Sequence, residues 1–586
     1  MKQAKATLEQ KRHSFSHVLA QAVLEMFPEA KLGIGPAIDD GFYYDFDLPR
    51  TLIPEDLALL EEKMRKIIAE DQKFERYEEP IDQSIAFLEK INQPYKGELA
   101  KELKENGEKQ VSFYKNGPFV DMCAGPHVQS TKELNPKAFK LTSIAGAYWR
   151  GSEKNKMLQR IYGWAFETEK ELKAYEQMME EAKKRDHREL GKKLEIFTFS
   201  DEIGAGLPIW LPYGTVLRDV LETLAKRKEF EQGYVRVSTP VITKEALFLK
   251  SGHLPHYKES MYSPMDIDGE TYYIKPMNCP FHHTVYASKP RSYRELPLRI
   301  AEYGLCHRYE KSGELQGLFR VRAMMMNDAH IYVRPDQVRE EIKKVIELHE
   351  YYYKLFHITK IKYRLSKHDK KELGHKYVDM PEAWATNEQI LREVMEEMRL
   401  DYFEADNEAA FYGPKIDINV YSAIGKEYTI GTVQLDFAQP LRFALRYTDE
   451  HGKEVMPYCI HRAPLAVHER FIGFLIEHYA GAFPVWLAPV QVKILPVSDK
   501  FNDYANSIAE KIKAMYGRVE VDTASETLGK KIRNAEMMKI PHIVVVGEKE
   551  EKEKSVTVRL FSTKEQKVYT VKEYLKELEK LIKLPV

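Results

Sequence analysis

Cysteine is scarce in this chain of 586 residues, which contains four, at positions 123, 279, 306 and 459. They are far apart and too few for a disulfide framework, so we expect the protein in a reducing compartment, the cytoplasm. No run of about 18 uncharged apolar residues occurs, and the sequence therefore predicts no membrane span. The first residues, Met1–Ala6, precede no apolar segment, which argues against a secretory signal.

An excess of charge of either sign is also lacking. The 89 lysines and arginines nearly balance the 90 aspartates and glutamates, which leaves a net charge of -1. Composition therefore does not mark the chain as a nucleic-acid-binding protein, and a polyanion would have to meet a local basic surface. Repeats at solenoid periods and low-complexity tracts are absent too. A chain of this length predicts about three or four domains.

Apolar periodicity and turn residues predict the elements of the first third of the chain. Residues 11–26 have helical spacing, and residues 38–47 indicate a hairpin with its turn at Asp40-Gly41. The other predictions are a polar helix over 54–70, a strand- and turn-rich stretch over 111–165, and a solvated helix over 168–193 that joins two domains.

From about residue 195 to about residue 485, apolar segments alternate irregularly and many residues are aromatic, which favours an antiparallel sheet with packed helices. The sequence pattern changes after Trp486. Predicted strands over 490–496, 519–522 and 542–546 then alternate with predicted helices over 501–516 and 528–538. This order predicts a small α/β unit with a parallel or mixed sheet.

Two segments each place an arginine close to a glutamate in apolar surroundings: Arg308-Tyr309-Glu310, and Ala463–Phe471 with its Glu469-Arg470 pair. Two guanidiniums that converge in a fold make a bidentate clamp for phosphate oxygens. An isolated triplet of this kind is more often a surface ion pair, worth about 0–1 kcal/mol. The surrounding sequence therefore has to decide between these interpretations.

The two segments resemble motifs 2 and 3 of the class II aminoacyl-tRNA synthetases. Three further segments narrow the resemblance to the threonyl-tRNA synthetase family: Lys275–Pro280, Asn327–His330 and Cys459–Ala463. The resemblance extends over nearly the whole chain. It implies a multidomain α+β fold: an α/β editing domain with a linker helix over 1–187, a class II catalytic core with an antiparallel sheet over 188–484, and an α/β anticodon-binding domain over 485–586. The implied activity is ATP-dependent attachment of L-threonine to tRNA(Thr), with hydrolytic editing of seryl-tRNA(Thr).

The resemblance implies a role for each charged residue of motifs 2 and 3. Arg308 would contact the α-phosphate of ATP, Glu310 the adenine amino group and Arg470 the γ-phosphate. Arg320 would lie along the phosphate tail, and Mg²⁺ would bridge the phosphates. Phosphoryl chemistry of this kind depends mostly on positioning and on cations placed near the transferring oxygens.

Cys279, His330 and His461 match the zinc ligands of the family, although each taken singly would be a buried core cysteine or a hydrogen-bonded histidine. Three protein ligands leave Zn²⁺ an open position, where threonine could chelate through its amino nitrogen and its hydroxyl. A site built to bind a hydroxyl rejects an analogue without one, such as valine, by about 10⁴–10⁵. The resemblance places Asp328 on that hydroxyl and Gln434 in the same pocket.

Gly233–Pro240 resembles motif 1, which implies a homodimer that forms through the region near Pro240. Taken alone, the segment is an ordinary strand that ends in a proline. His253 aligns with a histidine that lies near the tRNA 3′ end in relatives, where it would take a proton during transfer. A histidine in a surface loop is the competing interpretation.

Four residues imply the editing site: His13 and His17 on one face of the first helix, and Cys123 and His127 in a loop. Serine differs from threonine by one methyl, worth about 1–3 kcal/mol, so zinc cannot exclude it and a second site must hydrolyse seryl-tRNA. By residue type alone the four make a good zinc set, and histidines that only cap a helix are a third interpretation. The resemblance favours hydrolysis without metal, assisted by Asp121 and Lys156.

The residues that the resemblance places on the anticodon are Arg533, Glu550 and Arg559. Glutamate can accept from a cytosine amino group, and arginine can hold guanine edges or phosphate. Arg533 is a better candidate for general RNA contact than for base reading. The stretch Lys549–Lys554 could equally be a charged hairpin turn.

Several positions depart from the family pattern. Phe281 and Ala466 stand where members usually have glycine, Ala124 stands where many have arginine, and Met324–Met326 fills a region that often includes a glutamine. The chain also begins almost at the first editing helix, so we expect it to lack the ubiquitin-like domain that many relatives carry. These departures remove no proposed metal ligand or phosphate clamp, but they leave open the fine contacts around the adenylate and in the editing pocket. One alternative is a catalytically altered paralog that binds RNA or only edits, against which the retained Arg308, Glu310 and Arg470 argue. Another is a different class II specificity, and the zinc triad favours threonine over it.

Overall fold

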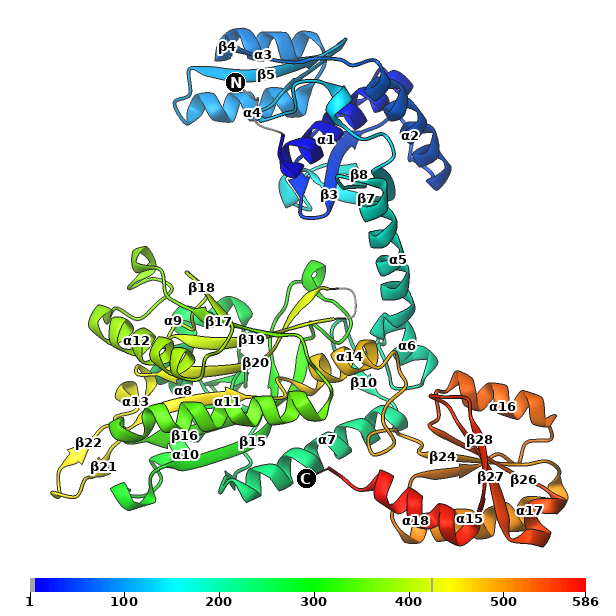
Figure 1. Ribbon diagram of the computed structural model, residues 1–586. Coiled ribbons are helices and arrows are strands. Elements are labelled where there is room, and N and C mark those ends of the chain that lie inside the picture. The colour runs from blue at the N-terminus through cyan, green and yellow to red at the C-terminus, as the bar shows by residue number, and fades with distance from the viewer. Residues whose placement is uncertain (1–5, 423–424, 586) are drawn as a thin grey trace. The chain divides into compact units, whose positions relative to one another are not determined.

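The computed structural model describes residues 6–422 and 425–585, which form two compact units divided in sequence between Glu180 and Glu181 (Figure 1). Both units combine helices with largely antiparallel sheets, so the multidomain α+β class expected from the sequence is confirmed. None of the helices in these two ranges combines the length and the apolarity that crossing a bilayer demands.

The first unit is built on a sheet with the order β1-β3-β8-β7, in which β2 also pairs with β3. Its strands are β1 (Lys31–Leu32), β2 (Ala37–Ile38), β3 (Gly41–Asp47), β7 (Phe139–Tyr148) and β8 (Met157–Ala165). Helix α1 (Leu8–Met26) begins after Thr7, whose side chain accepts a hydrogen bond from the Gln10 N–H. Its apolar face packs on β3 and on α2 (Pro54–Ala69). The helices predicted over 11–26 and 54–70 are therefore confirmed.

The hairpin predicted over 38–47 is present, but the prediction of its turn is wrong by one residue. Ile38 pairs with Gly41, so the turn residues are Asp39 and Asp40. Gly41 lies in β3, where a Cβ atom would stand 1.9 Å from the Gly163 carbonyl oxygen of β8. This glycine permits close strand packing, which local turn preferences cannot reveal.

The strand-rich stretch predicted over 111–165 is confirmed: it contains β7 and β8 of the first sheet and two strands of a second sheet. The second sheet consists of β4 (Phe74–Pro80), β5 (Gln110–Asn116) and β6 (Phe119–Met122), all antiparallel. Helices α3 (Ile81–Lys90) and α4 (Pro94–Glu105) belong to the same part of the chain. The sheet supplies Asp121, and Cys123 follows directly after β6.

The single helix predicted over 168–193 is wrong, because the chain forms two helices there, α5 (Glu169–Arg185) and α6 (His187–Lys193). Asp186 separates them. Its carboxylate accepts from the Arg188 N–H at 2.8 Å and so caps the start of α6. A charged, helix-favouring composition hides such a break, because aspartate is common both at helix starts and on solvated faces.

The second unit contains an eight-stranded sheet in the order β11-β15-β16-β23-β20-β19-β17-β18. The strands are β11 (Val235–Arg236), β15 (Leu298–His307), β16 (Ala323–Val333), β17 (Ile361–Ser366), β18 (Tyr402–Ala405), β19 (Lys415–Tyr421), β20 (Glu427–Asp436) and β23 (Tyr458–Ala463). All neighbours are antiparallel except the edge pairs β11–β15 and β17–β18. The antiparallel core sheet predicted from the sequence is therefore confirmed.

Successive side chains of the central strands point alternately to the hydrophobic core and to the face that carries the candidate site. Ala329, Ile331 and Val333 of β16 join the main core with α7 (Pro212–Glu231), α11 (Val338–Leu355) and α14 (His468–His478). Asp328 and His330 point to the opposite face, since successive residues of a strand alternate. The same period leaves His461 of β23, and Gln434 and Asp436 of β20, on the face that carries the site.

The C-terminal part of the second unit has a mixed sheet in the order β25-β24-β26-β27-β28 (Figure 1). Its elements are β24 (Val492–Pro496), α15 (Asn502–Ala514), β25 (Val519–Val521), α16 (Leu528–Met537), β26 (His542–Val546), β27 (Ser555–Leu560), β28 (Gln566–Thr570) and α18 (Val571–Ile582). The first three strands in the sheet order are parallel, and the last two pair antiparallel. The predicted α/β unit is confirmed.

The charged stretch at 549–554 is a helix and not a hairpin turn. Helix α17 spans Glu548–Glu553 and ends at Lys554, which has a φ of 50°. The Glu550 carboxylate accepts from the Gly547 N–H at 3.0 Å and so satisfies a free donor at the helix start. This contact makes Glu550 part of a helix terminus.

Candidate functional site

Three neighbouring elements bring the predicted metal ligands together. His330 of β16 lies directly opposite His461 of β23 in the strand register. Cys279 is the first residue of α10 (Cys279–Tyr286) and is fully buried. One donor atom from each of the three lies within 4.8 Å of the others, and His330 Nε2 is 3.1 Å from His461 Nδ1. Residues far apart in the sequence thus form one compact donor set.

The hydrogen bonds around this set fit a metal ion. His461 Nε2 lies 2.9 Å from Asp436 Oδ2, and His330 Nδ1 lies 2.8 Å from His282 Nδ1. With the outer nitrogens in these hydrogen bonds, the facing nitrogens His330 Nε2 and His461 Nδ1 can keep their lone pairs for a cation. A thiolate and two imidazoles suit Zn²⁺, with one position left open.

Burial sets the protonation of the donors. It lowers the pKa of His330 well below its usual value, aided by the neighbouring His461, so the imidazole is neutral and able to bind a metal. Burial also raises the pKa of the Cys279 thiol well above its usual value. A bound cation would favour the thiolate, so metal binding and release of the thiol proton are coupled.

A cavity of about 430 Å³ joins the metal ligands to the arginines of motifs 2 and 3. The predicted residues on its wall are Cys279, Arg308, Asp328, His330, Gln434, His461 and Arg470. Asn278 donates to Asp328 Oδ2 at 3.1 Å, and the Tyr412 hydroxyl donates to Gln434 Oε1. Sequence reasoning missed Asn278 and Tyr412, since neither carries a charge or a ligand atom that would have marked it.

The residues predicted to contact ATP divide into two groups. Arg308 and Arg470 line the cavity, where their Nε atoms donate to the carbonyl oxygens of Pro276 and Phe319, each at 3.2 Å. Burial lowers the pKa of Arg470, and the charges of Arg308 and Arg320 act in the same direction. Arg308 and Arg320 therefore each repel Arg470, and the two guanidiniums on the wall, Arg308 and Arg470, make this end of the cavity attractive to an anion.

Glu310 and Arg320 do not line the cavity in this structure. Arg320 Nε donates to Glu310 Oε2 at 2.8 Å, and a second nitrogen of Arg320 lies 3.0 Å from Glu314. The two predicted nucleotide contacts are thus paired with each other, and both would have to exchange partners to meet ATP.

Some of the departures from the family pattern fall on the same cavity. Met324 and Met326 line it together with Met277, so part of its wall is made of thioethers. Ala466 also lines it and has a φ of 47°, a left-handed conformation that costs a residue with a Cβ atom. Phe281 is buried against Phe248, away from the cavity wall.

His253 is buried, and its interpretation as a surface-loop histidine is wrong. It is the first residue of α9 (His253–Tyr257). Its Nδ1 lies 2.8 Å from the Ser251 hydroxyl, and its Nε2 lies 3.1 Å from Met277 Sδ and 3.7 Å from Cys279 Sγ. Burial, with the nearby charge of Arg308, lowers the pKa of His253 to about 3, so the side chain is neutral.

The four predicted editing residues also converge. Donor atoms of His13, His17, Cys123 and His127 lie within 4.8 Å of one another. Cys123 Sγ is 3.2 Å from His13 Nε2 and 3.5 Å from His127 Nε2. Burial lowers the pKa of His13 and raises that of Cys123 to about 11, so a neutral imidazole lies beside a neutral thiol. An imidazole in this state can accept a proton from water.

The lysine that reaches this cluster is Lys96 and not Lys156. Lys96 of α4 is buried, and its Nζ lies 2.8 Å from Asp121 Oδ1. Asp121 also accepts from the Tyr44 hydroxyl at 2.6 Å and lies 3.7 Å from His17 Nε2. Lys156 is exposed and pairs with Asp47 at 2.7 Å. Nothing in the sequence around Lys96 marks it, because it lies in a polar helix far from the histidines.

The predicted RNA-contacting residues lie on three elements of the C-terminal domain. Arg533 is exposed on α16. Glu550 accepts from the Thr557 hydroxyl at 2.9 Å in addition to its bond with Gly547, and Arg559 donates to Glu536 at 3.0 Å. Of the three, Arg533 has the side chain most available to a ligand.

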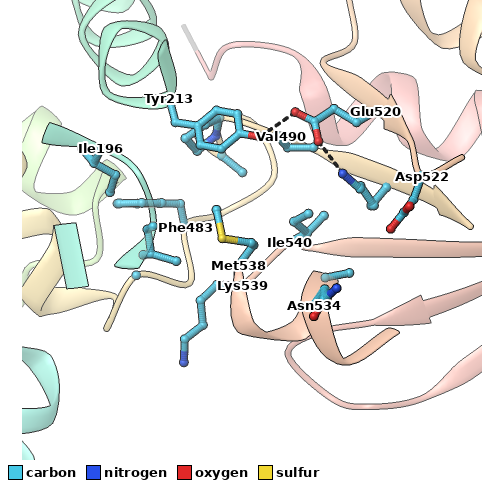
Figure 2. A pocket seen from close by; sticks show the side chains of 16 residues that line it. Ile196, Tyr213, Phe483, Val490, Glu520, Asp522, Asn534, Met538, Lys539 and Ile540 are labelled. Atoms are coloured by element: carbon cyan, nitrogen blue, oxygen red, sulfur yellow. Dashed lines mark hydrogen bonds and ion pairs between the residues drawn. The ribbon is translucent and has the colours of Figure 1, made fainter. Parts of the chain in front are cut away.

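A second cavity, of about 210 Å³, lies where the core meets the C-terminal sheet (Figure 2). The Tyr213 hydroxyl of α7 donates to Glu520 Oε1 of β25 at 2.7 Å, and Lys493 lies 2.6 Å from the other carboxylate oxygen. Phe483, Met538 and Ile540 supply an apolar part of the wall. This cavity contains none of the motif residues.

Comparisons with known proteins identify the families that match parts of this chain. Residues 262–479 match a family described as the tRNA synthetase class II core domain (G, H, P, S and T). Residues 491–581 match an anticodon binding domain, and residues 111–162 match the threonyl and alanyl tRNA synthetase second additional domain. The fold and the site therefore define a class II aminoacyl-tRNA synthetase.

Full-length similarity narrows this class. The chain is 49% identical over 565 residues to a threonine–tRNA ligase of Geobacillus kaustophilus, which covers 96% of this chain and 86% of that protein. It is 46% identical over 567 residues to threonine–tRNA ligase 1 of Bacillus subtilis, covering 97% and 87%. A crystal structure of the RNA binding domain of threonyl-tRNA synthetase from Cryptosporidium parvum superposes with a TM-score of 0.65 at 34% identity, over 68% of this chain and 98% of that one. The chain belongs to the threonine–tRNA ligase family.

Proposed function

We propose that this chain joins L-threonine to tRNA(Thr) through a threonyl-adenylate made from ATP, and that it hydrolyses seryl-tRNA(Thr) at a second site. The observation that carries the proposal is one cavity with a Cys/His/His donor set and Asp328 at one end and Arg308 and Arg470 at the other. A carboxylate held at the first end faces an α-phosphate held at the second. This proximity converts adenylate formation into a reaction between two positioned groups.

Threonine would be selected at the donor set. Cys279, His330 and His461 would hold Zn²⁺, which supplies an open position for the amino nitrogen and hydroxyl of the substrate. Asp328 would accept from that hydroxyl, and its bond with Asn278 keeps the carboxylate in place. Burial raises the pKa of Asp328, and a nearby cation would act in the opposite direction and favour the carboxylate. Valine keeps the amino nitrogen but has no hydroxyl, so it would leave the metal position for that hydroxyl and the Asp328 carboxylate without a partner.

ATP would bind along the arginine-rich end of the cavity. Arg308 would neutralise the α-phosphate and Arg470 the γ-phosphate, with Mg²⁺ bridging the phosphates. Glu310 and Arg320 would part, so that the carboxylate meets the adenine amino group and the guanidinium meets the phosphate tail. The repulsion between Arg470 and the other two guanidiniums would fall when the polyanion binds, which favours closure around ATP.

Editing would take place at the cluster of His13, His17, Cys123 and His127, without a metal. A neutral histidine would take a proton from the attacking water, and the ester bond of the serine would break as the tRNA hydroxyl regains a proton. Lys96 and Tyr44 hold Asp121 beside His17, which fixes the orientation of that imidazole. Lys156 has no part in this proposal, because it pairs with Asp47.

The motif 1 region would form a homodimer. Phe230 at the end of α7 has 83% of its surface exposed, and Val235 of β11 and Ile242 have 49% and 45% exposed. β11 is also the edge strand of the eight-stranded sheet. Exposed apolar side chains beside an open strand edge mark a protein interface.

Arg533, with Glu550 and Arg559, would meet the anticodon stem-loop. The four unpaired cysteines are consistent with a cytoplasmic protein.

ATP–pyrophosphate exchange tests this function. We expect exchange with threonine and serine and none with valine, and about one zinc per chain by metal analysis. Deacylation of seryl-tRNA(Thr) should persist after chelation, because the editing cluster needs no metal. Absence of exchange with every amino acid, with deacylation retained, would favour the editing-only paralog instead.

A further inference from the structure

A buried chain of hydrogen bonds leads from motif 1 to a metal ligand. The Thr239 N–H donates to Glu302 Oε1 at 2.7 Å, and Glu302 Oε2 lies 3.0 Å from His282 Nε2. His282 Nδ1 in turn lies 2.8 Å from His330 Nδ1. Thr239 precedes Pro240, and Glu302, His282 and His330 are all buried. The chain therefore joins the expected dimer region to the donor set without a break.

The direction of each proton follows from the metal end. His330 can offer Nε2 to a cation only if its proton is on Nδ1, which then donates to His282 Nδ1. His282 must then be protonated on Nε2, and this N–H donates to the Glu302 carboxylate. Glu302 also accepts from the N–H and the hydroxyl of Thr239, so both of its oxygens have donors. One arrangement of protons satisfies every member of the chain.

The donor His461 has a shorter arrangement of the same kind. Its Nε2 lies 2.9 Å from Asp436, whose other oxygen accepts from the Ala438 and Gln439 N–H groups. In both cases a carboxylate fixed by backbone donors decides which ring nitrogen carries the proton. The nitrogens of the two imidazoles that are free of these bonds, His330 Nε2 and His461 Nδ1, face each other at 3.1 Å.

We propose that His282 and Glu302 are positioning residues that fix the tautomer of His330, and that Thr239 anchors them to the motif 1 segment. The inference rests on the proposed function, because it assumes that His330 binds Zn²⁺. If His282 could not accept the hydrogen bond from His330 Nδ1, the proton of His330 could move to Nε2, and Nε2 would lose the lone pair that binds the metal. The partners of a metal-binding histidine typically contribute about 10–100-fold to affinity.

Two substitutions at His282 distinguish its role as a hydrogen-bond acceptor from the space that its side chain fills. In His282→Asn the amide oxygen takes the place of Nδ1 and keeps the acceptor for His330, whereas in His282→Gln the amide nitrogen takes the place of Nε2 and the acceptor is lost. His349→Gln removes another fully buried histidine, whose Nδ1 bonds the Val345 carbonyl outside the site, and serves as the control. Glu302→Gln tests the next member of the chain.

The readouts are zinc affinity by competition with a chromophoric chelator, the visible spectrum of the Co²⁺-substituted protein, and the melting temperature. We expect about 10–100-fold weaker zinc binding in His282→Gln with an altered Co²⁺ spectrum, and an intermediate loss in Glu302→Gln. His282→Asn should remain within about threefold of the parent protein, and His349→Gln should bind zinc normally.

Two outcomes would overturn the inference. In the first, His282→Asn and His282→Gln weaken zinc binding equally, which would indicate a purely structural role for His282. In the second, neither variant weakens zinc binding, which would show that the tautomer of His330 does not depend on His282. If the parent protein binds no zinc, the proposed recognition of the amino acid is wrong. This failure is distinguishable from failure of the tautomer inference, because it is seen in the parent protein without any variant.

Discussion

Glu469 of α14 is a buried carboxylic acid next to Arg470 in motif 3. Its Oε2 accepts from the Met325 N–H at 3.0 Å. Burial raises its pKa to about 7 from a usual 4.5, although this hydrogen bond opposes the shift. The folded protein therefore holds a proton that the unfolded chain would release above about pH 5.

The sign of the pH dependence follows directly. A carboxyl group whose pKa is raised on folding contributes stability below its unfolded pKa and loses it as the pH rises through the folded pKa, at about 1.4 kcal/mol per pKa unit. We predict that Glu469 contributes stability that is lost between about pH 5 and about pH 7, against the opposite contribution of the buried neutral histidines such as His330. Glu469→Gln should remove this loss, since its amide oxygen can still accept from Met325, so the melting temperature of the variant relative to the parent should rise with pH. Glu347→Gln on the exposed face of α11 is the control. The same pH dependence of the melting temperature in the parent and Glu469→Gln would contradict the prediction.

Single residues show how far sequence reasoning reaches and where it stops. Cys279, His330, His461 and the four editing residues could be named from motifs because each motif has a distinctive word. His282 and Lys96 could not, although each touches a named residue. Their roles depend on which side chains meet across a helix and a sheet, and spacing along one chain does not contain that information. The assignment of Lys156 failed for this reason.

At the scale of elements, regular periodicity predicted most helices and strands, and the errors fell at their ends. The turn at Asp39-Asp40, the break at Asp186 and helix α17 all depend on one hydrogen bond or one close approach. Composition averages over several residues, so it cannot resolve such local contacts. The strand order of the eight-stranded sheet likewise joins segments that no local pattern connects.

The break at Asp186 gives a prediction at this scale. Its carboxylate caps α6 and also pairs with the Arg188 guanidinium. Asp186→Ala should lower stability by about 0.5–2 kcal/mol, because the first N–H groups of the helix lose their acceptor. Asp186→Asn should recover most of the loss, since its amide oxygen can accept the same bond. Denaturant unfolding monitored by circular dichroism would measure both, and a neutral Asp186→Ala substitution would show that the cap does not matter.

At the scale of the whole molecule, the exposed apolar face near motif 1 predicts the oligomeric state. We expect the chain to sediment as a dimer at micromolar concentration, and Phe230→Glu to shift it toward the monomer. The side chain is largely exposed within one chain, so the substitution should not disturb folding. Tyr516→Glu, at a position with 93% of its surface exposed in the C-terminal domain, is the matched control.

A dimer that survives Phe230→Glu unchanged would place the interface elsewhere. A parent chain that sediments as a monomer at every concentration would remove the dimer from the proposal altogether. Neither result would affect the assignment of the catalytic cavity, because all of its wall residues come from one chain.

The pairing of His330 with His461 across β16 and β23 ties chemistry to folding. A slip of one residue between these strands would turn His330 and Asp328 toward the core and present Ile331 and Ala329 in their place. The donor set can therefore assemble only after the strands have found their native alignment. Uptake of the proposed zinc would then be a late event in folding, and newly made chains that retain the metal would be the ones whose central sheet has formed correctly.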